Sequence, residues 1–292
     1  MTALPDPAAT GPAGTDAQAP TIATLIRSAL GLGVGVFEAR LLLAHATGWR
    51  RETLIAYDDR VVAPDAAARF LQLAQARAQG EPIAYLLGER EFHGLSFAVG
   101  PGVLIPRPET EALVEFALAH APTGARVLDL GTGSGAIAIS VAAARPDLAV
   151  TAVDRSEAAL SIAARNNAHL AEGRVRLLAS DWYGALGEER YGVIVSNPPY
   201  VAAGDAHLDQ GDLRHEPRGA LTDEADGLQA IRAIVNDAPA HLAAPGWLAL
   251  EHGWDQGAAV RALLTARGFA EVRTDRDLAG IERMSLGRWP AA

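Results

Sequence analysis

The sequence predicts an α/β fold, with a mainly parallel sheet that follows a small helical bundle. From about residue 106 onward, short buried-strand segments such as 126–130 and 191–196 alternate with helical segments, the pattern of a sheet built from βα units. A glycine-rich turn at 131–135 joins the first of these strands directly to a helix. Residues 21–88 show mainly helical periodicity instead.

Composition and charge narrow the class of protein. With 292 residues, 49% hydrophobic and 21% charged, the chain is long enough for two domains with ordinary cores. The absence of cysteine excludes disulfides and thiolate metal sites. A formal net charge of -10 argues against a duplex-binding enzyme, so no direct nucleic-acid binding is expected. Because no apolar run has the length of a membrane span and no signal peptide opens the chain, we expect a cytoplasmic protein without a membrane partner. We also expect a monomer.

The N-terminal third divides into a leader and a helical domain. Residues 1–20 are mostly Ala, Pro, Gly, Thr and Asp without periodicity, which predicts a disordered leader. Residues 21–88 follow as a helical domain, in which Ile22, Leu25 and Ile26 recur on one face. This bundle is either a packing module or a domain that docks a protein substrate, and its own sequence does not decide between the two.

Residues 89–105 predict a β-hairpin that links the bundle to the sheet domain, residues 106–292. Arg107 stands between two prolines, which favours an extended and exposed side chain. Thr110 or Glu109 is expected to cap the helix that begins near Glu111.

The glycine turn contains Gly131, Thr132, Gly133, Ser134 and Gly135. Its glycines let a ligand approach the backbone closely, and without a Gly-Lys-Ser/Thr ending it is not a phosphate-binding P-loop.

Three polar or aromatic residues follow the next two strands. Asp154 ends the strand near 150–154, about 20 residues after the glycines, which is the spacing of a ribose-binding carboxylate. The alternative for Asp154 is a helix N-cap, a role that Ser156 fits better. Asp181 and Trp182 follow a third strand, 174–179, where Trp182 can stack on an adenine and Asp181 can accept from its amine. The alternative for Trp182 is core filling.

The most informative motif is Asn197-Pro198-Pro199-Tyr200, directly after the strand 191–196. The prolines cannot continue a central strand, so Asn197 is expected at the carboxyl end of the sheet with its side-chain amide and carbonyl free. The Asn197 carbonyl and the Pro198 backbone carbonyl can hold the N–H groups of an amide or exocyclic amine, and Tyr200 can stack on it. The alternative is an ordinary Asn-Pro turn.

The remainder completes the alternation of helices and strands. Residues 201–221 are too long for a simple connection and predict a lid or substrate-binding loop. His207 and His215 within this loop match no metal-ligand spacing, so no metal is expected. A helix at 227–242, a strand at 247–251, a helix at 255–267 and strands near 271–273 and 284–287 follow.

Residues 129–135, Asp154 and 197–200 together resemble the class I S-adenosylmethionine-dependent methyltransferases. This resemblance implies a seven-stranded, Rossmann-like sheet with helices on both faces. The Asn-Pro-Pro-Tyr motif is typical of members that methylate amide or exocyclic amine nitrogens. Further segments are similar to the protein-(glutamine-N5) methyltransferases of bacterial peptide chain release factors, namely residues 81–111, 180–182, 210–217 and Glu251-His252-Gly253-Trp254.

The resemblance implies a role for each motif. Residues 131–135 would line the methionine and ribose of S-adenosylmethionine, Asp154 would hold the ribose, and Asp181 with Trp182 would meet the adenine. Asn197, beside the cofactor, would bind the substrate glutamine with Pro198, Pro199 and Tyr200. In the family this glutamine belongs to the Gly-Gly-Gln loop of a release factor. Direct methyl transfer would leave S-adenosylhomocysteine.

Two other classes of protein stay open at this point. DNA adenine-N6 and RNA guanine-N2 methyltransferases share the motif, because an exocyclic amine presents the same chemistry. A DNA enzyme must flip its base and usually carries a basic recognition region, which the acidic charge disfavours. A non-catalytic adenosine-binding protein would not need the acceptors at 197–200.

Overall fold

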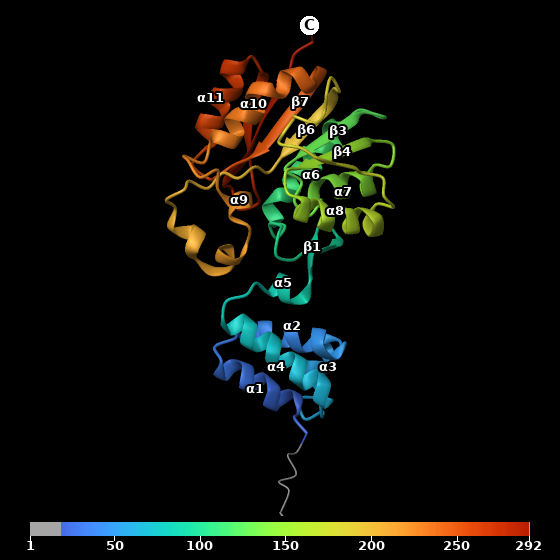
Figure 1. The fold of residues 1–292 in the computed structure, drawn as a ribbon, viewed down its shortest axis with the longest axis vertical. Helices are drawn as coiled ribbons and strands as arrows, with labels where there is room; N and C mark the ends of the chain where they lie inside the picture. The colour runs from blue at the N-terminus through green and yellow to red at the C-terminus, as the bar shows by residue number, and fades with distance from the viewer. Residues whose placement is uncertain (1–18, 292) are drawn as a thin grey trace, which may run out of the picture. The chain divides into compact units, whose positions relative to one another are not determined.

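A computed structural model describes residues 19–291 of the chain (Figure 1). The chain forms two compact units that divide between Gln79 and Gly80. The predicted leader lies outside the described residues, apart from its last two. Within residues 19–291, no helix combines the length and the apolarity that crossing a bilayer would need.

The first unit is a bundle of four helices, α1 (Ile22–Gly31), α2 (Val36–Thr47), α3 (Arg51–Ala56) and α4 (Pro64–Ala78). A capping box at Thr21 and Thr24 begins α1, and a left-handed Gly48 ends α2. Apolar side chains from all four helices fill the core, among them Leu25, Leu42, Leu54 and Phe70. The helical prediction for this region is therefore confirmed.

The second unit contains a seven-stranded sheet in the order β5-β4-β3-β6-β7-β9-β8, which confirms the predicted fold. Five strands run parallel: β3 (Arg126–Leu130), β4 (Ala149–Asp154), β5 (Arg176–Ala179), β6 (Tyr191–Ser196) and β7 (Leu242–Glu251). The strand β9 (Glu282–Trp289) lies between β7 and β8 (Ala270–Arg276) and runs antiparallel to both. The order reverses at β3, between β4 and β6, and ligands bind beside such a switch point.

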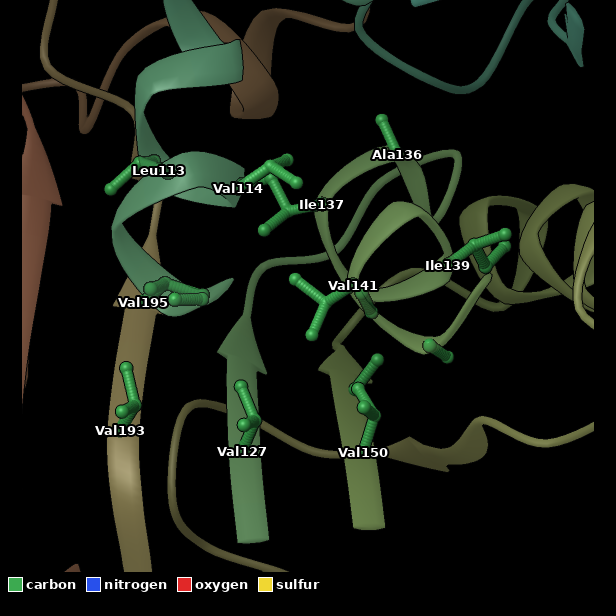
Figure 2. Close-up of a cluster of buried hydrophobic side chains, with 14 of the residues drawn as sticks. Leu113, Val114, Val127, Ala136, Ile137, Ile139, Val141, Val150, Val193 and Val195 are labelled. Atoms are coloured by element: carbon green, nitrogen blue, oxygen red, sulfur yellow. The ribbon is translucent and has the colours of Figure 1, made fainter. Parts of the chain in front are cut away.

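Helices cover both faces of the sheet because alternate residues of each buried strand point to opposite sides. Figure 2 shows Val127, Val150 and Val195 facing α6 (Glu111–His120) and α7 (Ala136–Ala144), with α8 (Glu157–Leu170) beside them. Leu128 and Ile194 face the opposite way, toward α10 (Gln229–His241) and α11 (Gly257–Arg267).

The helix α5 (Ile83–Leu87) and the hairpin of β1 (Glu89–Phe92) and β2 (Leu95–Ala98) pack within the second unit. The Tyr85 hydroxyl donates to the Val103 carbonyl at 2.6 Å, and Asn166 of α8 bonds the Ala98 backbone. The compact division therefore differs from the boundaries expected at residues 88 and 105. The boundary differs because Phe92 and Phe97 of the hairpin are buried in the same apolar cluster as residues of α6 and α7. The hairpin is therefore part of the core of the second unit.

Short helical turns make up the loop after β6. These are η2 (Ala206–Asp209), η3 (Gly211–His215) and α9 (Arg218–Leu221), while η1 (Pro108–Thr110) precedes α6. The carboxyl ends of β3, β4, β5 and β6 open toward these segments, and this edge of the sheet holds the candidate site.

Candidate active site

A cavity of about 690 Å³ lies at the carboxyl ends of the central parallel strands. It is lined by seven of the residues that the sequence predicted for a site: Gly131, Gly133, Asp154, Asp181, Trp182, Asn197 and Pro199. Residues 102–104, 217–224 and the start of α10 supply further walls. The size suits a ligand as large as a nucleoside derivative.

The glycine turn presents only part of its length to the cavity. Gly131 has φ +72, a left-handed value that glycine adopts without strain. Thr132 and Ser134 are buried behind the turn, where the Thr132 hydroxyl donates to Asp129 Oδ2 at 2.6 Å. Gly135 is the N-cap of α7. Of the five predicted residues of the turn, 131–135, only Gly131 and Gly133 line the cavity.

The Asp154 carboxylate is fixed by two backbone donors. The Gly133 N–H donates to its Oδ2 and the Ser156 N–H to its Oδ1, each at 2.9 Å. Each oxygen keeps a further lone pair, so the cavity side can accept from two hydroxyl groups. Ser156 caps α8 by accepting from the Ala159 N–H, as expected.

Trp182 is held in an unusual backbone conformation at the edge of the cavity. Its φ is +47, a left-handed value that costs a tryptophan about 1–2 kcal/mol. The Ser180 hydroxyl donates to the Trp182 carbonyl at 2.8 Å and stabilises this conformation. The ring packs partly against the core on the α10 side, so Trp182 both fills core and lines the cavity.

Asn197 is not free in the way the sequence suggested. Its Nδ2 donates to the Thr110 hydroxyl at 3.1 Å, and that hydroxyl donates to Glu251 Oε2 at 2.7 Å. No other hydrogen bond to the Asn197 side chain forms within the described residues, which leaves its carbonyl oxygen as an acceptor beside the cavity. Thr110 also differs from expectation, because its side chain makes no cap bond to α6.

Tyr200 is anchored at both ends and does not line the cavity, nor does Pro198. Its hydroxyl donates to Glu251 Oε1 at 3.2 Å, and its carbonyl accepts from Gln256 Nε2 at 3.0 Å. Burial raises the pKa of Tyr200 and keeps the phenol protonated.

Sequence reasoning from the residues missed Thr110 and Glu251 as members of the site. Glu251 is fully buried at the end of β7, and burial raises the pKa of its carboxyl group to about 7. One signal could have found it: like Asp154 and Asn197, it follows the last apolar residues of a predicted strand.

Glu216 attaches the loop after Tyr200 to residues 105–107. This buried carboxylate accepts from the Ile105 N–H at 2.9 Å and forms an ion pair with Arg107. Burial raises the pKa of Glu216, and the Arg107 charge opposes that shift. Arg107 is thus extended, as expected, but its guanidinium is paired and only 32% exposed.

Comparisons with known proteins give the family. Residues 108–212 match the methyltransferase small domain model, and residues 28–88 match the PrmC N-terminal domain model. The release factor glutamine methyltransferase of Burkholderia pseudomallei is 56% identical over 278 residues, 92% of this chain and 96% of that protein. The chain belongs to the release factor glutamine methyltransferase family. The Escherichia coli member is 45% identical over 253 residues, 86% of this chain and 91% of that protein.

A solved structure supports the fold. The 16S rRNA N2 G1207 methyltransferase of T. thermophilus, in complex with AdoMet and guanosine, has a TM-score of 0.51 and 23% identity. The similarity covers 68% of this chain and 49% of that protein. Membership of the release factor glutamine methyltransferase family makes this protein a methyltransferase, and the DNA and RNA alternatives are not favoured.

Proposed function

We propose that the protein transfers a methyl group from S-adenosylmethionine to the side-chain amide nitrogen, N5, of the glutamine in the Gly-Gly-Gln loop of peptide chain release factors. Support comes from two features that share one cavity. The first is a glycine turn beside the strand-end carboxylate of Asp154. The second is Asn197, whose nitrogen is already bonded to Thr110 so that its carbonyl oxygen is left for a substrate N–H.

The cavity suits S-adenosylmethionine in size and in donor set. Gly131 and Gly133 expose backbone without side chains, Asp154 has acceptors left for two ribose hydroxyls, and Trp182 with Asp181 can meet an adenine. In the proposal, these five cavity-lining residues hold S-adenosylmethionine. When bound, S-adenosylmethionine supplies an electrophilic methyl group on a sulfonium.

The remaining residues must activate a poor nucleophile, because an amide nitrogen shares its lone pair with the carbonyl. In the proposal, the Asn197 carbonyl oxygen accepts one amide hydrogen beside the cavity. The backbone carbonyl of Pro198, which stands in the chain between the lining residues Asn197 and Pro199, accepts the other, so that the lone pair turns toward the methyl carbon. The nitrogen then forms a bond to that carbon while the carbon–sulfur bond breaks and its electron pair moves to sulfur. One amide proton passes to water, and S-adenosylhomocysteine is released.

We also propose that the N-terminal bundle docks the release factor. A single glutamine offers little discrimination, since most proteins display several, so selectivity needs a second contact surface. The described part of the bundle exposes large apolar side chains, Phe37 (64%), Ile55 (61%), Tyr57 (59%) and Val61 (56%). In the proposal, these side chains supply the apolar contacts to the release factor.

A truncated chain tests the docking role. The cut belongs before Gly80, because α5 and the hairpin pack within the second unit. After a thermal melt has established folding, transfer to intact release factor should fall far more than transfer to a short Gly-Gly-Gln peptide. Equal transfer to intact release factor by the truncated and full chains would reduce the bundle to a stabilising module.

The enzymatic function is tested with labelled S-adenosylmethionine and parallel acceptors. These are purified release factor, the same factor with its Gly-Gly-Gln glutamine replaced by alanine, duplex DNA and ribosomal RNA. Label should enter only the intact release factor. Label in the alanine variant would show that a residue other than the Gly-Gly-Gln glutamine is methylated. Label in nucleic acid would favour the alternative of an exocyclic amine as the acceptor.

A further inference from the structure

Three side chains from distant parts of the chain form a continuous polar relay behind the substrate acceptor. Asn197 Nδ2 donates to Thr110 Oγ at 3.1 Å, and Thr110 Oγ donates to Glu251 Oε2 at 2.7 Å. Asn197 follows β6, Thr110 ends η1 and Glu251 ends β7. Thr110 is 5% exposed and Glu251 is 3% exposed, so water does not compete for these bonds.

The relay has only one consistent direction when Glu251 is ionised. A carboxylate can only accept, so the single hydroxyl hydrogen of Thr110 is committed to Glu251. Thr110 can then only accept from Asn197, which must present its NH₂ group to the hydroxyl. A flipped Asn197 amide would place two acceptor oxygens against each other with no hydrogen between them.

We propose that Glu251 is a positioning residue that acts through Thr110 to set the orientation of the Asn197 amide, so that its carbonyl oxygen faces the substrate glutamine. This inference rests on the proposed function, since only an amide substrate needs an acceptor at that place. If Asn197 turned its NH₂ group toward the substrate, that group would face the N–H groups of the substrate amide, and two donors cannot form a hydrogen bond.

The same carboxylate holds the other end of the motif. Glu251 Oε1 accepts from the Tyr200 hydroxyl at 3.2 Å, while Gln256 Nε2 holds the Tyr200 carbonyl at 3.0 Å. Residues 251–256 therefore fix both the first and the last residue of the Asn-Pro-Pro-Tyr motif. Because two prolines stiffen the motif, a displacement of Tyr200 also displaces Asn197, and the reverse holds as well.

The protonation of Glu251 decides whether the relay keeps its direction. The groups that act on Glu251 are Thr110 and Glu109 from η1, Tyr200 after β6 and Arg283 from β9. Burial raises the pKa to about 7, Glu109 raises it further and Arg283 lowers it. A protonated Glu251 can donate to Thr110 and free the threonine hydrogen for the Asn197 carbonyl, which permits the unproductive flip. Transfer should therefore decline as the pH falls below about 7.

Three nearly isosteric variants test the relay in the full-length enzyme. Glu251→Gln and Thr110→Val should reduce single-turnover transfer to release factor at least tenfold at pH 8, while Thr110→Ser should retain most of it. The dissociation constant of S-adenosylmethionine should stay within about twofold in all three. Thr151→Val removes the hydroxyl of another buried threonine, within β4, and is the control for that loss; it should keep the wild-type rate of transfer.

Three further readouts separate positioning from a purely structural effect. The decline below about pH 7 should disappear in Glu251→Gln, and the double variant Thr110→Val/Glu251→Gln should lose no more rate than the worse single variant. Hydrogen exchange of the Asn197 NH₂ group, followed by NMR, should be slow in wild type and Thr110→Ser and faster in Thr110→Val.

The outcomes distinguish the relay from the proposed function. Folded Glu251→Gln and Thr110→Val variants with wild-type transfer and an unchanged pH profile would overturn the relay alone. A wild-type enzyme that transfers nothing to release factor would overturn the proposed function. In that case the hydrogen-exchange rate of the Asn197 NH₂ group still tests the relay, because it needs no methyl transfer. Equal exchange rates in wild type and Thr110→Val would refute the relay.

Discussion

Replacing Gly227 with alanine should displace the Tyr200 backbone and slow methyl transfer. Gly227 has φ +77, and a methyl group on it would lie 2.3 Å from the Tyr200 carbonyl oxygen, whereas ordinary contact begins near 3.4 Å. The loop around Gly227 cannot easily yield, because the Asp223 carboxylate accepts from the N–H groups of Ala225, Gly227 and Gln229. Tyr200 must therefore move by roughly 1 Å, a misplacement that can cost about 10²-fold in rate.

A second glycine separates this displacement from backbone strain. Gly124 has φ +72, but a methyl group there would meet nothing within 4 Å. Both alanine variants should lose about 1–2 kcal/mol of folding stability from the left-handed conformation. Only Gly227→Ala should slow transfer.

The assay is single-turnover methylation of release factor at saturating S-adenosylmethionine, with cofactor affinity by calorimetry and folding by thermal melt. Cofactor affinity should stay near wild type in Gly124→Ala, which has no contact with the cavity. A folded Gly227→Ala enzyme that keeps the wild-type rate would refute the claim that Tyr200 must stay in place for transfer.

Three other variants and conditions address separate parts of the site. Asn197→Ala should bind S-adenosylmethionine nearly normally by calorimetry yet lose about 10²-fold or more in single-turnover rate, because one positioned acceptor is gone; near-normal transfer would refute its role. Asp154→Ala should raise the dissociation constant of S-adenosylmethionine about ten- to 150-fold, equivalent to about 1.5–3 kcal/mol for lost charge-assisted bonds; an unchanged constant would leave Asp154 only a structural role. Burial raises the pKa of both Asp129 and Glu251 to about 7, so the folded state binds more protons than the unfolded state and the free energy of unfolding should fall as pH rises from about 4.5 to 7.5. Urea unfolding across this range should show a shallower fall in Glu251→Gln, and an identical slope would contradict the raised pKa of Glu251.

Local sequence signals predicted the elements that position the cavity. The strand at 126–130 has the predicted bounds because it runs directly into a glycine turn. The strand at 191–196 has the predicted bounds because it ends shortly before two prolines. Ser156 was identified as the cap of α8 because an N-cap needs only a hydroxyl at the right offset.

The partners of the site residues could not be predicted in the same way. Thr110 meets Glu251 across 141 positions of sequence, and Arg107 meets Glu216 across 109. Such pairings depend on how η1, β7 and the loop after β6 come together in three dimensions, and no periodicity records this. The local rules favoured a cap for Thr110 and solvent for Arg107, and the tertiary partners overrode both.

The position of Trp182 makes it a built-in optical probe. Of the five tryptophans in the sequence, all of which fall within residues 19–291, only Trp182 lines the cavity. The others sit elsewhere: Trp49 under the Arg60 guanidinium, Trp247 beside Phe116, Trp289 against Phe269, and Trp254 at 70% exposure. A ligand that stacks on Trp182 should quench its emission and leave the other four indoles unchanged. Intrinsic fluorescence would then report cofactor occupancy without a label, and Trp182→Phe would keep an aromatic surface while removing the signal.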